Sequence, residues 1–532
     1  MASRTARWTL SDRLVSWLDP ARGVERWRAR KHEALAGGYN GAKRTRRQTD
    51  GWAPGGGSAN ADQLPDLPAL RERSRDLMRN APLALGAVST VVTNVVGTGL
   101  AVQPAIDAEL LGLSRAQADA WQAAAKREFR LWAESKLCDV TRTQNFYGLQ
   151  DLCFRSSLEN GDTIVLTPVI RTPESPYGLK LQLVEADRLC NPEGRADSPE
   201  LAGGIAIDQY GAPQTYHIMR SHPGELGRID RKWDAIPARG ASTGRRNVLH
   251  VYRRVRIGQL RGMPYLAPII ELLKQISTYS ENEITASVVS SLFTVFIRTQ
   301  DGADIQVPLD GAPGVADPYD PSKFKLGPGA ALALAEGDTV EFANPLRPNS
   351  SFDAFMMAAL KQFSMALELP LEVLIKHFTS SYTAARGAFL EAWKFFKVRR
   401  GELATDFCQP VYELLIDEAV ALGRLAAPGY FRDAAVRAAY LRAEWVGDGP
   451  GSIDPLKEAE AAEKRMAIRV STLQKESMAY DGSNWEDNIA QSKREREAIG
   501  DLPDPPKPAA ASDPAADPAA PNAPVDDNEE LP

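Results

Sequence analysis

Histidine and serine are the first residues of this 532-residue sequence to consider for chemistry, and neither forms a recognisable site. His217 and His250 lie in stretches of alternating apolar residues, so we expect them in strands and not as ligands. The sequence around Ser380 and Ser381 matches no nucleophile motif, so we expect no catalytic role there. The five histidines are widely separated along the chain: His32, His217, His222, His250 and His377.

Catalytic motifs with a fixed spacing are also absent from the sequence. It contains no Walker A, HExxH, CxxC or GxSxG pattern. The triple glycine at 55–57 is not followed by Lys-Ser/Thr and no strand pattern precedes it, so it gives almost no support to a phosphate loop. We therefore expect a protein that is not an enzyme, with no cofactor and no metal site. A nuclease or protease of a mobile element, with a site assembled from distant segments, is one alternative.

The cysteines and the start of the chain indicate a cellular compartment. Cys138, Cys153, Cys190 and Cys408 follow neither a disulfide nor a zinc spacing, so we expect buried free thiols in a reducing cytoplasm. The N-terminal residues contain no apolar h-region, which argues against a secretory signal.

Residues 81–101 are about as long as a membrane span, but polar side chains interrupt them and most of their apolar residues are small. A core helix that ends at Gly97 or Gly99 fits better, because glycine adopts the left-handed conformation at a helix end at little cost. A membrane-peripheral helical scaffold that uses this segment is a second alternative.

Composition predicts a soluble protein of two to four domains, with 43% hydrophobic and 25% charged residues. The net charge of −6 argues against wrapping DNA through bulk positive charge. The two ends differ sharply, because residues 1–50 hold twelve Lys/Arg against five acids, while residues 501–532 hold eight acids and only Lys507. Such ends are either solvated tails or partner-docking arms.

Hydrophobic periodicity predicts an α+β fold. Residues 1–35, 67–100 and 114–160 look helical. Strand patterns then follow at 163–170, 179–186, 203–208, 214–219 and 247–253, with a hairpin turn at Asp208–Gly211.

The second half of the chain is predicted to be mostly helical. A long helix is expected from 261 to about 292, then a turn-rich insertion with strand-like ends at 293–345, and a second helix at 351–367. Another long helix starts near Thr383, and Pro410 is expected to kink or break it. Its expected buried stripe is Phe389, Trp393, Phe396, Leu403 and Phe407. Residues 454–498 look helical and charged, and the Pro/Ala/Asp-rich end is expected to be disordered.

Several short motifs, in order, resemble the lambda-like phage portal proteins. These are LRERSRDLMRN at 70–80, NVVGTG at 94–99, GQLRGMPYLAP at 258–268, YTAARGAFLEAW at 382–393, FCQPVY at 407–412 and IDPLKE at 453–458. The resemblance extends over roughly residues 37–498, including a weaker match at Trp485-Glu-Asp.

The resemblance implies a portal-type subunit with an α/β wing, a helical stem, a small β-containing clip and a helical crown. Its expected divisions are a basic N-terminal arm (1–66), the wing (67–260), a stem helix (261–292), the clip (293–345), a second stem helix with a channel loop (346–382), a long helix with the crown (383–498) and a disordered acidic tail (499–532).

The resemblance also implies a function and its partners. The subunit would form a homo-oligomeric ring of roughly twelve copies at one capsid vertex of the virion, after assembly in the host cytoplasm. Double-stranded DNA would pass through this ring during packaging and ejection. Further implied partners are the terminase large subunit, head-completion or connector proteins, and the major capsid or scaffold protein. No membrane is implied.

Two groups of residues are candidates for nucleic-acid contact. The channel-loop candidates are Lys376, His377, Thr379, Ser380 and Ser381, although the resembling family usually carries an acidic or small polar run where this chain has the basic pair. A solvated or intersubunit turn is the alternative for that pair. The arm candidates, Lys43, Arg44, Arg46 and Arg47, could touch DNA, scaffold or shell, or form a solvated arm.

Overall fold

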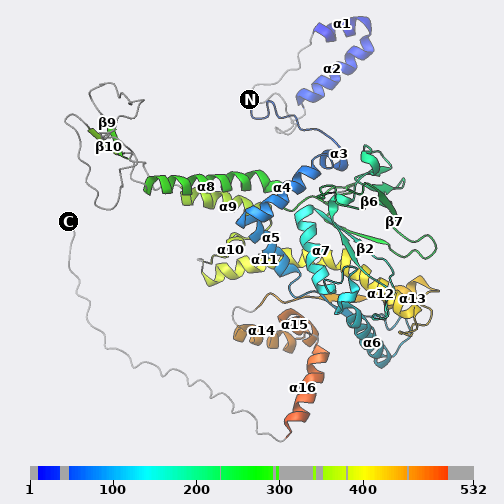
Figure 1. Ribbon diagram of the computed structural model, residues 1–532. Coiled ribbons are helices and arrows are strands. Elements are labelled where there is room, and N and C mark those ends of the chain that lie inside the picture. The colour runs from blue at the N-terminus through cyan, green and yellow to red at the C-terminus, as the bar shows by residue number, and fades with distance from the viewer. Residues whose placement is uncertain are drawn as a thin grey trace, which may run out of the picture.

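The computed structural model describes residues 10–35, 47–227, 229–291, 295–298, 339–342, 352–378, 381–451, 455–483 and 485–500. Within them the chain is a mixture of helices and antiparallel sheets, as the α+β prediction requires (Figure 1). Most of the region 293–345, the segment 36–46 and residues 501–532 lie outside the described residues, so the expectations about them stay predictions.

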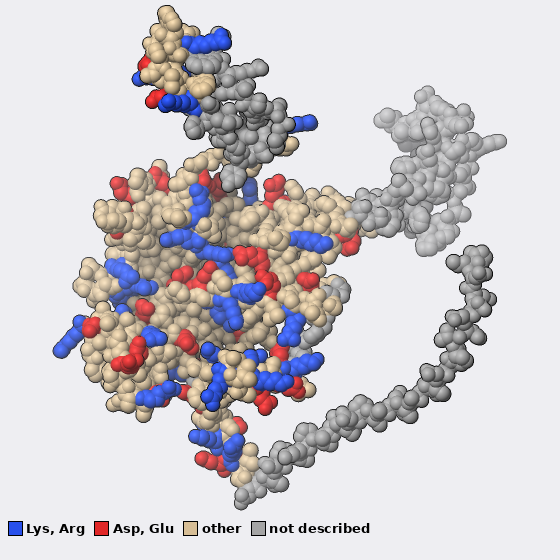
Figure 2. Space-filling view, turned by 180° about the vertical axis from the view of Figure 1, so that it is seen from behind, with Lys and Arg blue, Asp and Glu red and all other residues tan. Residues whose placement is uncertain are grey.

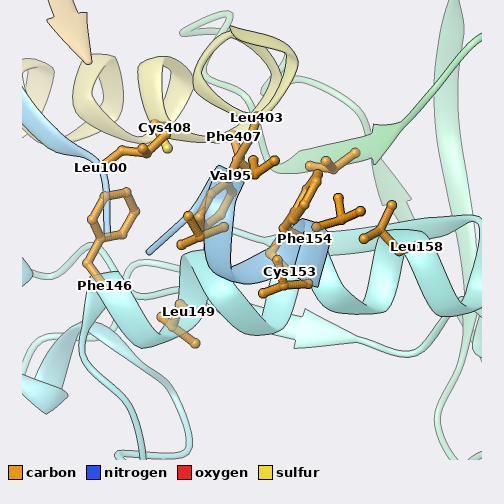
Figure 3. Close-up of a cluster of buried hydrophobic side chains, with 14 of the residues drawn as sticks. Val95, Leu100, Phe146, Leu149, Cys153, Phe154, Leu158, Leu403, Phe407 and Cys408 are labelled. Carbon is orange, nitrogen blue, oxygen red and sulfur yellow. The ribbon is translucent and has the colours of Figure 1, made fainter. Parts of the chain in front are cut away.

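A helical body forms the centre of the molecule. Its helices are α4 (Leu67–Asn80), α5 (Pro82–Val95), α6 (Arg115–Ala133), α7 (Phe146–Asn160), α10 (Leu371–Ile375), α11 (Tyr382–Leu403), α12 (Gln409–Ala421) and α13 (Ala434–Tyr440). Buried aliphatic and aromatic side chains from these helices make one large core. Figure 3 shows part of it, where Phe146 and Phe154 of α7 lie on the side of that helix nearer to Leu403 and Phe407. The rings of Phe146 and Phe407 stack with centroids 5.5 Å apart.

Helix α5 runs through the middle of this body. Val88, Val91 and Val95 are fully buried, and the helix stops just before Gly97, whose φ is +58°. The predicted core helix is therefore confirmed, and the proposal that residues 81–101 serve as a membrane surface is wrong, because protein covers that apolar face. Among the described helices, none combines the length and apolar character needed to cross a bilayer.

The helix that begins at Tyr382 continues past the expected break at Pro410. A π-helical turn at Ala404–Cys408 joins α11 to α12, and Pro410 lies in the first turn of α12. There its missing N–H costs little, so the irregularity falls in the turn before proline. The expected buried stripe is correct for Phe396, Leu403 and Phe407, whereas Trp393 is half-buried and Phe389 is 39% exposed.

Two antiparallel sheets form the region between α7 and the next long helix. One has the order β3-β2-β8, from β2 (Asp162–Leu166), β3 (Gln182–Val184) and β8 (Val248–Tyr252). The other has the order β4-β5-β6-β7, from β4 (Leu201–Ala202), β5 (Ile205–Ile207), β6 (Pro213–Met219) and β7 (Trp233–Pro237). A second apolar cluster, including Ile164, Ile205 and Tyr216, fills the space between them.

The five predicted strands and the hairpin turn are confirmed, while β4 and β7 were not predicted. The carboxylate of Asp208 accepts hydrogen bonds from the N–H groups of Tyr210 and Ala212, which closes the turn. Short 3₁₀ turns occupy Lys136–Cys138, Ala186–Arg188 and Pro192–Gly194.

Helices α8 (Ile270–Ser291) and α9 (Phe352–Ala366) lie side by side and project from the body, with β9 (Val295–Arg298) and β10 (Thr339–Phe342) paired at their outer end (Figure 1). The predicted start of this helix at 261 is wrong. A 3₁₀ turn at Ala267–Ile269 precedes α8, and residues 261–266 are irregular because Pro264 and Pro268 disfavour a regular helix there.

The remaining elements lie near the two ends of the chain and beside the body. The N-terminal helices are α1 (Leu10–Leu18), α2 (Pro20–Leu35) and α3 (Ala59–Gln63), and the C-terminal ones are α14 (Pro455–Ala467), α15 (Leu473–Tyr480) and α16 (Trp485–Ile499). Strands β1 (Ala101–Pro104) and β11 (Ala443–Val446) pair antiparallel although they are distant in sequence. All four cysteines are free thiols, as predicted, but Cys190 is only half-buried.

Candidate nucleic-acid interface

The predicted channel loop is shorter than expected, because helix α10 occupies its first part. Val373 and Leu374 are buried, and α10 contacts α5, α9 and α11. Lys376 ends the helix in the left-handed conformation, with φ +54°, and the N–H of His377 donates to the carbonyl of Glu372 at 3.2 Å. The body therefore holds one end of the loop while the Lys376 and His377 side chains are exposed.

The other end of the loop is fixed by α11. Ser381 is the N-cap residue, and its hydroxyl accepts a hydrogen bond from the N–H of Ala384 at 3.4 Å. Phe378 stacks on Phe389 of α11, with centroids 5.2 Å apart and an interplanar angle of 13°. This contact explains why Phe389 is outside the core. Thr379 and Ser380 lie outside the described residues.

The electrostatic character of the loop favours anions. The first turn of α11 contains no acidic residue, so the partial positive charge of its N-terminus is not neutralised there. Arg386 adds an exposed cation in the next turn of α11, after the loop. Exposed N–H groups, a helix N-terminus and cations are the groups that bind phosphate oxygens.

The arm candidates are not brought together with the loop by any described contact. Lys43, Arg44 and Arg46 lie outside the described residues, and Arg47 is exposed in a turn at 47–50. On the face of the body in Figure 2, basic and acidic side chains are intermingled and no broad surface of one sign appears. Attraction of a polyanion to that face would therefore depend on local groups.

A buried ionic joint, which the sequence analysis missed, links the sheets to the projecting helices. Asp162, at the start of β2, is fully buried and accepts hydrogen bonds from Arg71 of α4 at 2.8 Å and from Arg261 at 2.6 Å. His250 of β8 lies 3.1 Å from the same carboxylate. The N–H of Gly262 also points to it, at 3.3 Å. Three segments, α4, β8 and residues 261–262, thus converge on one carboxylate.

The other donors of the two arginines are satisfied by backbone carbonyls. Arg71 donates to Asn160, and Arg261 donates to Leu189, Gly203 and Ala186. Arg261 therefore links three backbone carbonyls in the turns of the sheet region to the segment that leads into α8.

Burial alone would raise the pKa of Asp162, but Arg261 and Arg71 outweigh it and hold this pKa well below its ordinary value. Burial lowers the pKa of Arg71 to about 10, against the opposing effect of Asp162. It also lowers the pKa of His250, although Asp162 opposes that shift. The joint at neutral pH consequently consists of one carboxylate, two guanidinium groups and a neutral imidazole whose Nε2–H faces the carboxylate.

A signal for this joint was present in the sequence. Arg71 occupies the buried face of α4 together with Leu67, Ser74 and Leu77, a position where a charge must find a partner. The partner, Asp162, is 91 residues away and opens a strand, so spacing could not identify it.

A second, more exposed group of charges ties the sheet region to the ends of the helices that flank the loop. Arg253, after β8, pairs with Glu368 at 3.1 Å and with Glu402 of α11 at 3.7 Å. The hydroxyl of Tyr265 donates to the carbonyl of Leu367, at the end of α9. The loop is therefore braced from the sheet side as well as from the body.

The described histidine, cysteine and acidic side chains were expected not to form a metal site. In the parts of the chain that the structure describes, no three His, Cys, Asp or Glu residues gather as metal ligands. His217 and His250 both lie in strands, as predicted, and His250 contacts a carboxylate within the joint.

Comparison with known proteins gives the family. A model described as phage portal protein, lambda family, matches residues 45–400, which include the joint, the projecting helices and the loop. The chain belongs to the lambda family of phage portal proteins. Portal protein B of Escherichia phage lambda is 26% identical over 479 residues, covering 86% of this chain and 89% of the relative. The portal protein of Escherichia phage N15 is 25% identical over 478 residues, covering 86% and 88%.

Solved structures from gene transfer agent particles are similar at lower identity. A chain of the native particle virion has a TM-score of 0.42 and 14% identity, covering 80% of this portal chain and 93% of its own length. A chain from the neck of the native particle has a TM-score of 0.41 and 12% identity, covering 79% and 94%. The resemblance seen in the sequence is confirmed by the family match, and this portal protein therefore belongs to a structural family and not to an enzyme family.

Proposed function

We propose that this portal protein forms a homo-oligomeric ring of roughly twelve subunits at one capsid vertex, and that double-stranded DNA passes through the ring during packaging and ejection. The family match over residues 45–400 carries the proposal. A subunit of a closed ring needs two different complementary surfaces, and a body with a projecting pair of helices offers them. The subunits would assemble in the host cytoplasm before the particle is complete.

Further partners follow from the same role. The outer end of the α8–α9 projection, with the β9–β10 pair, would meet the terminase large subunit and later the head-completion or connector proteins. The basic arm, with Lys43, Arg44, Arg46 and Arg47, would contact DNA or the major capsid or scaffold protein.

The ring is tested by single-particle electron microscopy of the purified chain, with no other component added. We expect a closed ring with a central hole wide enough for duplex DNA. Monomers or dimers at micromolar concentration in that sample would contradict the ring.

Within the ring, the loop between α10 and α11 would contact the DNA backbone. Exposed Lys376 and His377, and the N-terminus of α11 capped by Ser381, supply groups that bind phosphate oxygens. The Phe378–Phe389 stack and buried α10 would keep the loop in place against a moving duplex. Thr379 and Ser380 would add hydroxyl donors.

The loop role is tested by the double variant Lys376→Ala/His377→Ala in particles that package DNA. We expect fewer filled heads or poorer retention of the genome, with rings still formed. The matched control is Arg231→Ala/Lys232→Ala, which removes two exposed cations from the sheet region. Packaging and retention equal to those of the control would exclude the loop from DNA contact.

A further inference from the structure

The N-terminal helical hairpin presents an apolar face that its own fold leaves exposed. Helices α1 and α2 pack on each other. On α1, Leu14, Trp17 and Leu18 are 60%, 81% and 71% exposed, and their spacing places them on one side of the helix. An exposed tryptophan flanked by leucines is typical of a surface that binds another chain.

The same hairpin is cationic. Arg13, Arg22 and Arg28 are exposed, and Arg22 pairs with Asp19 at 3.7 Å. Residues 10–35, which form the hairpin, hold six basic and four acidic side chains, a net charge of +2, and residues 1–50 as a whole hold twelve and five, a net charge of +7. The surface therefore favours a partner that is acidic and also offers apolar groups for Trp17.

The opposite end of this chain has that chemistry. Residues 501–532 contain eight acids and one lysine, a net charge of −7, together with nine prolines. Proline-rich segments bind to exposed aromatic side chains at a small entropic cost, because their backbone is already extended. The two ends thus complement each other in charge and in the pairing of proline with tryptophan.

We propose that residues 501–532 bind the α1–α2 hairpin, of the same subunit or of a neighbouring one. The segment follows α16, and its 32 residues can span roughly 105–115 Å when extended, more than enough to reach around the body. Its carboxylates neutralise the arginines of the hairpin while its prolines cover Trp17.

The proposal is tested on the full chain by carbodiimide coupling, which joins carboxylates to lysines in direct contact, followed by peptide mapping. We expect coupling of the C-terminal acids to Lys31 or Lys43, reduced at least tenfold at high salt because screening weakens the contact. An excess of the free 501–532 peptide should suppress the coupling. A peptide in which Asn and Gln replace the eight acids should not suppress the coupling.

Two variants locate the binding surface. Trp17→Ser/Leu18→Ser removes the apolar contact, and Arg22→Ser/Arg28→Ser removes charge; each should lower the coupling several-fold. All four side chains are exposed, so folding of the hairpin does not depend on them. Tyr210→Ser, which removes an equally exposed aromatic ring from the sheet region, is the control and should leave the coupling unchanged. Coupling that is unchanged in both hairpin variants, or spread evenly over lysines of the body, would overturn the proposal whether or not rings form.

Discussion

Asp162 is the residue on which the connection between the sheets and the projecting helices depends. Its carboxylate lies between the buried guanidinium groups of Arg71 and Arg261. Because both arginines are buried, water cannot hydrate them if the carboxylate is removed. Removing one partner of a buried ion pair leaves a charge without compensation, which costs much more than the pair itself contributes.

We predict that Asp162→Asn lowers the free energy of unfolding by about 3–5 kcal/mol, the usual cost of breaking a buried pair. Urea unfolding followed by circular dichroism measures it. Asp119→Asn breaks an exposed pair with Arg115 on α6 and should cost less than about 1 kcal/mol. Equal losses in the two variants would show that the joint does not hold the fold.

His250 makes stability depend on mildly acid pH. Burial lowers its pKa below the ordinary value of 6.5, so the folded state takes up the proton less readily than the unfolded state. The contribution of neutral His250 to the free energy of unfolding is fully present above pH 6.5. It is lost as the pH falls toward the lower pKa of the folded state, at up to about 1.4 kcal/mol per pH unit.

We predict that His250→Gln flattens this decline between pH 6.5 and 5, as measured by urea unfolding across that range. His217→Gln is the comparison, because burial also lowers the pKa of His217 but no hydrogen bond joins it to the joint. If the pH dependence of the His250 variant equals that of the wild type, protonation of His250 is not its cause.

At the scale of elements, one close backbone contact fixes how α7 and β2 meet the segment before α8. A Cβ on Gly262 would lie 1.9 Å from the carbonyl oxygen of Gly161, whose own φ is +93°. No side chain fits between these two backbones, so the contact requires glycine on both sides.

We predict that Gly262→Ala destabilises the chain by more than about 2 kcal/mol, because the backbones must separate next to the Asp162 joint. Gly387→Ala, in α11 with open space around it, should instead stabilise by about 0.5–1 kcal/mol through helix propensity. Thermal unfolding of both variants tests the pair, and effects of the same sign would refute the argument.

The elements that sequence predicted correctly are those whose pattern is local. Alternation identified β2, β3, β5, β6 and β8, and glycine marked the end of α5. Strands β1 and β11 have four residues each, and each becomes a strand by pairing with the other, more than 300 residues away. A short stretch of sequence therefore carries no alternation pattern long enough to predict either one. The start of α8 was placed too early because an apolar spacing continues through the prolines that interrupt the helix.

The candidate loop was predictable only in part, for the same reason. Exposure of Lys376 and His377 follows from their polarity, but the Phe378–Phe389 stack and the bracing by Arg253 require knowledge of which segments meet. The Asp162 joint was missed entirely, since its four side chains come from positions 71, 162, 250 and 261.

At the scale of the whole molecule, apolar side chains on the projecting helices indicate where subunits meet. Ile284 on α8 is 65% exposed, and Met365 near the end of α9 is 82% exposed. We predict that Ile284→Asp shifts purified protein from rings toward monomers without lowering the unfolding temperature. Leu226→Asp, in an exposed turn of the sheet region, should leave the rings intact. Mass photometry distinguishes the species, and rings of unchanged abundance with Ile284→Asp would rule out this helix face as a contact.

The pairing of β1 with β11 also sets an order of events during synthesis. Strand β1 must wait for Trp445 and its neighbours, which leave the ribosome about 340 residues later, or roughly 20–70 s at bacterial elongation rates. Until then the edge of β1 is open and Phe129 lacks its contact with Trp445. A ribosome that stops early therefore releases a subunit with an unpaired strand in its body, a state that aggregates or is degraded. The body can therefore close only after translation has passed β11, and a proposed ring would be built only from subunits translated at least that far.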